Sequence, residues 1–181
     1  FMSIKEIHKG LIDSQGRRKY FAALNPKLQD KPFELDVKSI KKKQKILFIV
    51  PNFRWIDKDV NALWDLVPWN LCLIAANIED ICAEVKIIDS YKKNLSQEEL
   101  SKQIKNYKPD IVGLTILMDQ YADVGPMTTK IVKDISKDTL TVLGGVYAMA
   151  NPERAMKDKN LDYVVIGEGE YVFKQLVGFY S

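Results

Sequence analysis

Three short segments of the chain carry residue types that fit contact with a ligand. Gly144-Gly145 is a glycine pair, which lets backbone approach a bound molecule or simply forms a tight turn. Gly167–Glu170 combines two glycines with two carboxylates, and Thr115 places a hydroxyl directly after an apolar run. The last two patterns also have structural explanations: carboxylates favour a helix N-terminus, and a threonine hydroxyl often bonds to local backbone.

The residues used for nucleophilic and metal chemistry are scarce. His8 is the single histidine, and it lies near the N-terminus, away from every predicted strand. Cys72 and Cys82 are too few for a disulfide framework, a four-cysteine zinc site or a protein-held iron–sulfur cluster. Their positions around a predicted helix favour core packing. We therefore expect no catalytic residue and no metal-ligating residue in this chain.

The composition is that of an ordinary globular protein. The chain has 181 residues, of which 46% are hydrophobic and 28% charged. No unbroken apolar run approaches 18 residues, so we expect no membrane-spanning helix. The polar first ten residues lack the apolar region of a signal peptide. Together with the low cysteine count, this predicts a cytoplasmic protein.

Positive charge gathers at the N-terminal end. Residues 1–45 contain 12 Lys and Arg against five Asp and Glu, whereas residues 46–181 contain 15 against 19. A basic arm can bind nucleic acid, a membrane surface or an acidic partner, but a solvated leader or linker is the simpler explanation. We predict no DNA binding. The chain divides into a basic arm or linker over 1–44 and an α/β domain over 45–181.

Five apolar segments alternate with helical patterns after residue 44. The predicted strands are Lys45–Val50, Glu84–Asp89, Asp110–Leu117, Thr139–Leu143 and Asp162–Ile166. The alternation predicts a doubly wound parallel α/β sheet. Right-handed crossovers bring all strand-to-helix loops to one edge, where ligands of such sheets bind.

The predicted loops exclude four common ligand sites of this architecture. The loop over 51–55 has no glycine, which disfavours a dinucleotide site and a P-loop. It also lacks the hydroxyl residues of a flavodoxin-type phosphate loop. The third strand ends in Thr115, where a response regulator would need aspartate. Phe53 and Trp55 either form a wall for a large flat ligand or pack on the sheet edge.

Six sequence pieces occur in an order that resembles a known family. They are PWNLCLIAA (68–76), VKIID (85–89), PDIVGLT (109–115), LGGVYA (143–148), NPE (151–153) and DYVVIGEGE (162–170). This string resembles the N-terminal cobalamin-binding domain of cobalamin-dependent radical SAM enzymes. The resemblance covers roughly residues 45–180, and the glycine pair together with Gly-Glu-Gly-Glu is its most specific part.

The resemblance implies a flavodoxin-like, Rossmann-like sheet of five parallel strands in the order 2-1-3-4-5, with helices on both faces. Cobalamin would lie over the carboxyl ends of the strands, with its nucleotide tail between sheet and helices. A side chain added at Gly145 would project toward the tail. The residues implied as cofactor-binding are Asn52, Phe53, Arg54, Trp55, Thr115, Leu117, Met118, Tyr121, Gly144, Gly145, Val146, Tyr147, Gly167, Glu168, Gly169 and Glu170.

Two family motifs are absent from the sequence. Without Asp-x-His-x-x-Gly after the first strand, the cobalt would have no histidine lower ligand. Without CxxxCxxC, the SAM and the 4Fe-4S cluster of the parent enzyme would belong to a C-terminal radical SAM domain that follows this chain.

The resemblance therefore implies a cobalamin-binding domain of a radical SAM methyltransferase or related enzyme, not catalytic by itself. Two alternatives stay open. One is a degenerate domain of the same fold that acts as a protein-interaction scaffold, and the other is an unrelated small-molecule-binding α/β protein.

Overall fold

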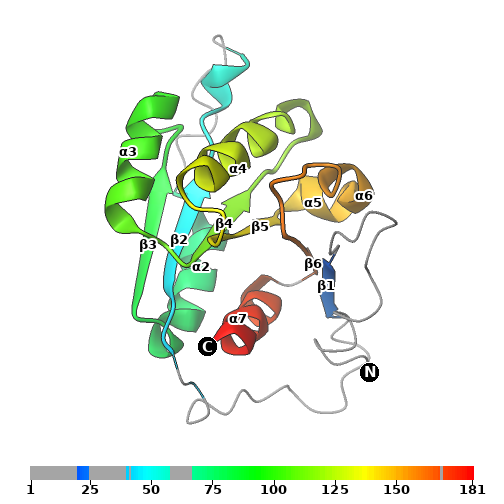
Figure 1. Ribbon diagram of the computed structural model, residues 1–181. Helices are drawn as coiled ribbons and strands as arrows, with labels where there is room; N and C mark the ends of the chain where they lie inside the picture. The colour runs from blue at the N-terminus through cyan, green and yellow to red at the C-terminus, as the bar shows by residue number, and fades with distance from the viewer. Residues whose placement is uncertain (1–19, 25–39, 41, 58–66, 168) are drawn as a thin grey trace.

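The computed structural model in Figure 1 describes residues 20–24, 40, 42–57, 67–167 and 169–181. Six parallel strands form one sheet in these residues, in the order β1-β6-β5-β4-β2-β3. Their bounds are β1 Tyr20–Leu24, β2 Lys45–Val50, β3 Glu84–Asp89, β4 Ile111–Thr115, β5 Leu140–Gly144 and β6 Tyr163–Gly167.

The five predicted strands all form, and their order β3-β2-β4-β5-β6 is the predicted order 2-1-3-4-5. Their apolar runs are explained by position: the four inner residues of β2 and all five of β4 are buried. A further strand, β1, comes from the N-terminal segment, where the sequence predicted none. It pairs in parallel with β6 and extends the sheet at that edge.

Helices cover both faces of the sheet (Figure 1). One face packs against α2 (Trp69–Ile78) and α7 (Gly169–Tyr180). The other packs against α3 (Gln97–Tyr107), α4 (Val124–Ile135), α5 (Val146–Ala150) and α6 (Pro152–Ala155). Short 3-10 turns are η3 (Phe53–Trp55), η4 (Glu79–Ile81) and η5 (Asp119–Tyr121). In the described part of the chain, no helix has the length and apolarity needed to cross a bilayer.

The start of α3 follows from a local sequence signal. The Ser96 hydroxyl accepts a hydrogen bond from the Glu99 backbone N–H at 3.1 Å, and the Glu99 carboxylate accepts one from the Ser96 backbone N–H at 2.8 Å. This reciprocal pair is the capping box, which satisfies two donors that the helix itself cannot. This local signal fixes where α3 begins.

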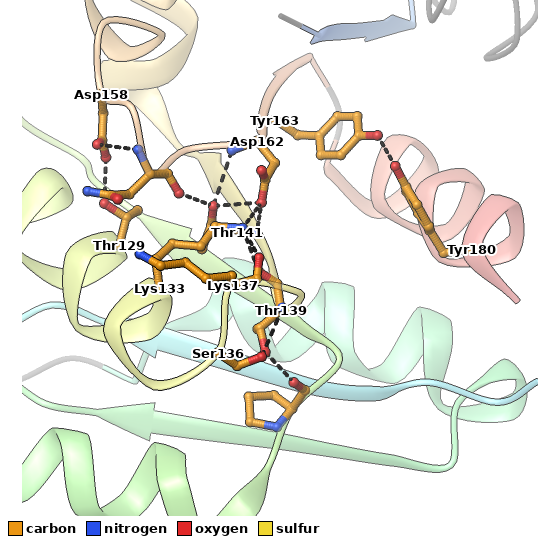
Figure 2. A network of polar contacts seen from close by, with 12 residues as sticks. Thr129, Lys133, Ser136, Lys137, Thr139, Thr141, Asp158, Asp162, Tyr163 and Tyr180 are labelled. Carbon is orange, nitrogen blue, oxygen red and sulfur yellow. Dashed lines mark hydrogen bonds and ion pairs between the residues drawn. The ribbon is translucent and has the colours of Figure 1, made fainter. Parts of the chain in front are cut away.

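A buried lysine holds the opposite, amino-terminal edge of the sheet together (Figure 2). The Lys133 ammonium on α4 donates to the Asp162 carboxylate at 2.6 Å and to the backbone oxygens of Thr139 and Lys137 at 2.8 and 3.2 Å. All three ammonium protons therefore have acceptors. The same carboxylate oxygen accepts from the Thr141 backbone N–H at 2.8 Å. One cation thus joins α4 to the starts of β5 and β6.

We predict that Lys133→Met lowers the free energy of unfolding by about 3 kcal/mol, because it leaves a half-buried carboxylate and two carbonyls without their cation. Urea denaturation measures this change. The matched control is Lys130→Met on the same helix, whose ion pair with Asp134 is exposed, and its loss is expected to stay below about 1 kcal/mol. Equal losses in the two variants would show that the buried cation has no special role.

Candidate functional site

A cavity of about 500 Å³ lies between the sheet and helices α2 and α7, at the carboxyl ends of the strands. This is the edge where ligands of parallel α/β sheets bind. Its walls are mostly apolar, and the few polar side chains stand at strand ends or in the first helical turns. The cavity is therefore suited to a ligand that inserts an apolar group and keeps polar groups at the mouth.

Strand register divides the sheet wall of the cavity into two rows. Phe48, Gly113 and Val142 lie side by side on β2, β4 and β5 and form the inner row. Two residues further along, Thr115 and Gly144 are paired in the outer row. Two residues of a parallel strand span about 6.6 Å, so the inner row lies that far below the mouth.

An aromatic pair closes the inner end of the cavity. The rings of Phe48 on β2 and Phe173 on α7 lie with centroids 4.9 Å apart, and both side chains are buried. Gly113 makes room for them, because a Cβ there would lie only 2.6 Å from Phe48 Cδ1. A glycine on β4 thus allows two large rings to lie against the sheet.

A hydrogen bond between two side chains crosses the mouth of the cavity. Asn70 Nδ2 on α2 donates to Thr115 Oγ1 on β4 at 2.9 Å, and Thr115 is only 4% exposed. Among the described residues this is the one hydrogen bond that either side chain makes. The Thr115 hydroxyl proton and the Asn70 side-chain oxygen can therefore bond to a ligand at the mouth.

The two glycines of the pair have different roles. Gly145 has φ +94°, and a Cβ there would lie 2.6 Å from the Ile116 backbone oxygen and 2.9 Å from Thr115 Oγ1. The expectation that a side chain at Gly145 would enter the ligand space is wrong, because the end of β4 blocks it. A Cβ at Gly144 would instead meet its nearest neighbour, Val165 Cβ, at an ordinary 3.9 Å. Gly144 is the position where an added side chain would enter the cavity.

The cavity gathers nine of the sixteen residues implied by the resemblance, drawn from four separate loops. They are Phe53, Thr115, Leu117, Gly144, Gly145, Val146, Gly167, Gly169 and Glu170. Six do not line it: Asn52, Arg54, Trp55, Met118, Tyr121 and Tyr147. Glu168 lies outside the described residues.

The polar groups of the β2–α2 loop bond to the loop after β3. The Leu95 backbone oxygen accepts hydrogen bonds from Asn52 Nδ2 at 3.0 Å and from Trp55 Nε1 at 2.9 Å. Arg54 Nη1 donates to the Tyr91 backbone oxygen at 2.8 Å. These contacts fix the 3-10 turn η3. For Trp55, packing at the sheet edge is thus the better explanation of the two that the sequence left open.

Two of the aromatic residues implied by the resemblance are part of the core. Tyr121 stacks on Phe53 with centroids 4.8 Å apart and helps to position that lining ring. Tyr147 is buried on the opposite face of the sheet, where burial raises the pKa of its phenol despite the nearby Arg154 cation. Tyr147 therefore stays neutral and contributes packing on that face.

Several lining residues were not predicted from the sequence. Asn70 and Ile74 come from one side of α2, Phe173 from α7, and Phe48 and Gly113 from inside the strands. The available signal was periodicity: every second residue of a central strand and every fourth residue of a helix share a face. Site residues were predicted from the sequence only in the loops, so the lining residues on the helices and inside the strands were missed.

The chain offers little for direct chemistry at this site. Cys82 does not line the cavity, and burial raises the pKa of its thiol to about 11, so it stays protonated at neutral pH. Among the described residues, no group of three or more His, Cys, Asp or Glu side chains could hold a metal ion. His8 lies outside the described residues.

A second cavity of about 450 Å³ lies on the other face of the sheet, beside α4 and α6. Its lining includes Asp123, Arg154, Lys157, Asp158 and Lys159. These opposite charges are mixed, and Arg154 and Asp158 already bond to Asp119 and Thr129. Its apolar residues, among them Leu114, Leu143 and Leu161, thus lie beside a rim of mixed charge that the first cavity does not have.

The fold and the cavity define a ligand-binding α/β domain whose site lies at the carboxyl edge of the sheet. The description of the matching family is B12 binding domain, and the match covers residues 60–177. The chain belongs to this family, and the resemblance seen in the sequence is confirmed.

Curated relatives include two methyltransferases and a cyclase. An uncharacterized methyltransferase of Pyrococcus horikoshii is 36% identical over 111 residues, which are 61% of this chain and 24% of that protein. Cytidylyl-2-hydroxyethylphosphonate methyltransferase of Streptomyces wedmorensis is 27% identical over 80% of this chain and 30% of its own length. Anaerobic magnesium-protoporphyrin IX monomethyl ester cyclase of Rubrivivax gelatinosus is 29% identical over 74% and 24%. The chain thus spans about a quarter of the length of these relatives.

Solved structures show the same fold. The cobalamin-dependent S-adenosylmethionine radical enzyme OxsB, with aqua-cobalamin and S-adenosylmethionine bound, matches with a TM-score of 0.59 and 13% identity over 77% of this chain and 19% of OxsB. A cobalamin-binding protein from Desulfitobacterium hafniense DCB-2 matches with a TM-score of 0.50 and 15% identity, over 73% and 57% of the two chains.

We predict that alanine destabilises the fold at Gly145 and has little effect at the neighbouring Gly144. Gly145→Ala should destabilise the fold by about 1–3 kcal/mol, because of its positive φ and its contact with the end of β4. Gly144→Ala should change stability by less than about 1 kcal/mol, since its Cβ meets no close neighbour. Thermal and urea unfolding of the two variants measure this. Equal stability of the two variants would contradict the assignment of the strained position to Gly145.

Proposed function

We propose that this domain binds cobalamin, with the nucleotide tail in the cavity and the corrin ring outside the strand ends. The observation that carries the proposal is the glycine-lined cavity of about 500 Å³, which has an apolar inner end and both polar and apolar side chains at its mouth. A nucleotide tail has the same order of groups, with a flat base at its end and a sugar and phosphate behind it. Membership of the B12 binding domain family supports the proposal independently.

The lining residues fit such a tail in three ways. The buried Phe48 and Phe173 rings form an apolar floor beneath the space that a flat base would occupy. Gly144 leaves the strand edge bare, so that sugar and phosphate can approach backbone. The Thr115 side chain has a hydroxyl proton to donate at the mouth.

Apolar side chains around the mouth suit the flat corrin ring. Val67, Trp69, Leu117, Val146 and Met149 all line the cavity and are exposed, Trp69 most of all at 69%. Exposed apolar patches of this kind mark binding surfaces. We propose that they cover one face of the corrin and exclude water from it, while the cavity orients the ring by holding its tail.

The chemistry of the whole protein is part of the proposal. Bound cobalamin would supply group transfer at its cobalt, and this chain would hold and orient it. We propose that the parent protein is a radical SAM methyltransferase or related enzyme, in which a following domain binds SAM and a 4Fe-4S cluster and closes the cofactor site. The names of the relatives support this class. The cytoplasmic location stays a prediction.

We predict that the full chain binds hydroxocobalamin and that Gly144→Leu weakens binding at least tenfold. The leucine side chain would occupy the outer row of the cavity, where a Cβ has room but a ligand would no longer fit. Titration followed by the visible spectrum of the cofactor measures the affinity, and circular dichroism checks the fold.

Ala76→Leu is the matched control for that titration, because Ala76 lies on the exposed side of α2. The control variant should bind as the wild type does. Unchanged binding by a folded Gly144→Leu variant would contradict the placement of the tail in the cavity.

We propose further that cobalamin is bound without a histidine lower ligand, because the sequence offers only His8. His8→Ala should leave the visible spectrum of the bound cofactor unchanged. A spectral shift in this variant, of the kind that accompanies loss of an axial nitrogen ligand, would show that His8 coordinates cobalt.

A further inference from the structure

The polar residues of helix α2 face the inside of the domain. The helix contains no charged residue, and its two polar residues are Asn70 and Asn77. Asn70 donates its hydrogen bond to Thr115 on β4, and Asn77 Nδ2 donates to the Glu170 backbone oxygen on α7 at 2.8 Å. The polar side chains of α2 are therefore used within the domain and not on its surface.

The solvent-facing side of α2 is apolar instead. Trp69 is 69% exposed, Leu73 is 56% exposed, and Ala76 is exposed as well. These positions are four and three residues apart, so they lie along one side of the helix. We call Trp69, Leu73 and Ala76 the α2 stripe.

Other surface helices of the domain have the ordinary pattern. Helix α3 exposes Glu98, Lys102 and Lys105, and α4 exposes Lys130 and Asp134. Both helices bury an apolar side against the sheet and present charges to solvent. A helix that is apolar on two opposite sides is typical of one that is packed on both.

The cofactor site accounts for only one end of the α2 stripe. Trp69 lines the first cavity, whereas Leu73 and Ala76 do not. A ligand at the mouth would therefore cover Trp69 and leave the rest of the stripe in water. Something other than the cofactor is needed to cover Leu73.

We infer that the α2 stripe packs against an apolar surface of another domain of the same polypeptide, the one that closes the cofactor site. The inference rests on the proposed function, which includes such a domain. A surface that covers the cavity mouth reaches the stripe directly, because Trp69 belongs to both. The three curated relatives are long enough to contain such a domain, since this chain spans only 24–30% of their length.

A second copy of this chain is a poorer partner for the stripe. Trp69 to Ala76 is about 10 Å of helix, and three side chains cannot supply the roughly 800 Å² per partner that a stable dimer buries. Contact within one polypeptide needs less area, because the linker keeps the two surfaces at a high effective concentration. The small size of the stripe therefore favours a domain of the same polypeptide.

Hydrogen exchange tests the inference by comparing the 181-residue chain with the full-length parent protein, both without cobalamin. The backbone amides of residues 73–78 on α2 should exchange at least about tenfold more slowly in the parent protein, because packing on a second side suppresses local opening. The amides of α3, whose outer side is charged, should exchange equally in both proteins. Equal exchange of α2 in the two proteins would overturn the inference.

Leu73→Lys should remove the extra protection of α2 in the parent protein and leave the urea midpoint of the 181-residue chain unchanged. Ala76→Lys should act in the same way and serves as the second variant if the first does not fold. Asn106→Lys is the matched control, because it adds the same charge at an exposed position of α3. This control should keep the slow exchange of α2. Retained protection in a folded Leu73→Lys parent protein would contradict contact through the stripe.

Two further measurements separate the alternatives. Sedimentation of the 181-residue chain should show a monomer, and a dimer that Leu73→Lys dissociates would assign the stripe to a second copy and overturn the inference. Leu73→Lys should also leave the affinity of the chain for hydroxocobalamin unchanged. Failure of the wild-type chain to bind hydroxocobalamin would contradict the proposed function, while the exchange comparison would still decide the domain contact.

Discussion

The site depends on one steric constraint: two glycines on neighbouring strands face the same pair of helices. Side chains alternate across a strand, so Gly113 and Gly144 leave bare backbone on the side of the sheet that α2 and α7 cover. Gly113 gives that space to the Phe48 and Phe173 rings, and Gly144 leaves it open. A sheet with ordinary side chains at both positions would pack directly against the helices and have no cavity.

Two sets of polar contacts join the sheet to its helices, one at each edge. The Asn70–Thr115 hydrogen bond joins α2 to β4 at the mouth, and the Lys133 cluster fixes the starts of β5 and β6 at the opposite edge. The cavity itself lies at the carboxyl ends of the strands, between the sheet and these helices. The result is a binding domain whose own residues hold and orient a ligand, and whose chemistry would come from that ligand and from other parts of the protein.

The sequence was sufficient for the fold because the five strands from β2 on are continuous apolar runs separated by clear helix signals. It was insufficient for β1, whose five residues lie in a basic segment and gain their place only by pairing with β6. In the site, the loop residues at Thr115, Gly144 and Gly167 were predicted, but the walls were not. Some predicted loop residues were wrong, because a polar or aromatic loop residue can bond to a neighbouring loop as well as to a ligand. This is the case for Asn52, Arg54 and Trp55.

The most direct test of tail binding between the sheet and α2 and α7 is the backbone amide NMR spectrum of the chain during titration with cobalamin. We expect the largest shifts at Gly113, Thr115 and Gly144, which line the cavity. The amides beside the second cavity, at Thr129 and Leu161, should move little. Shifts concentrated at Thr129 and Leu161, with Gly113 and Gly144 unmoved, would contradict it.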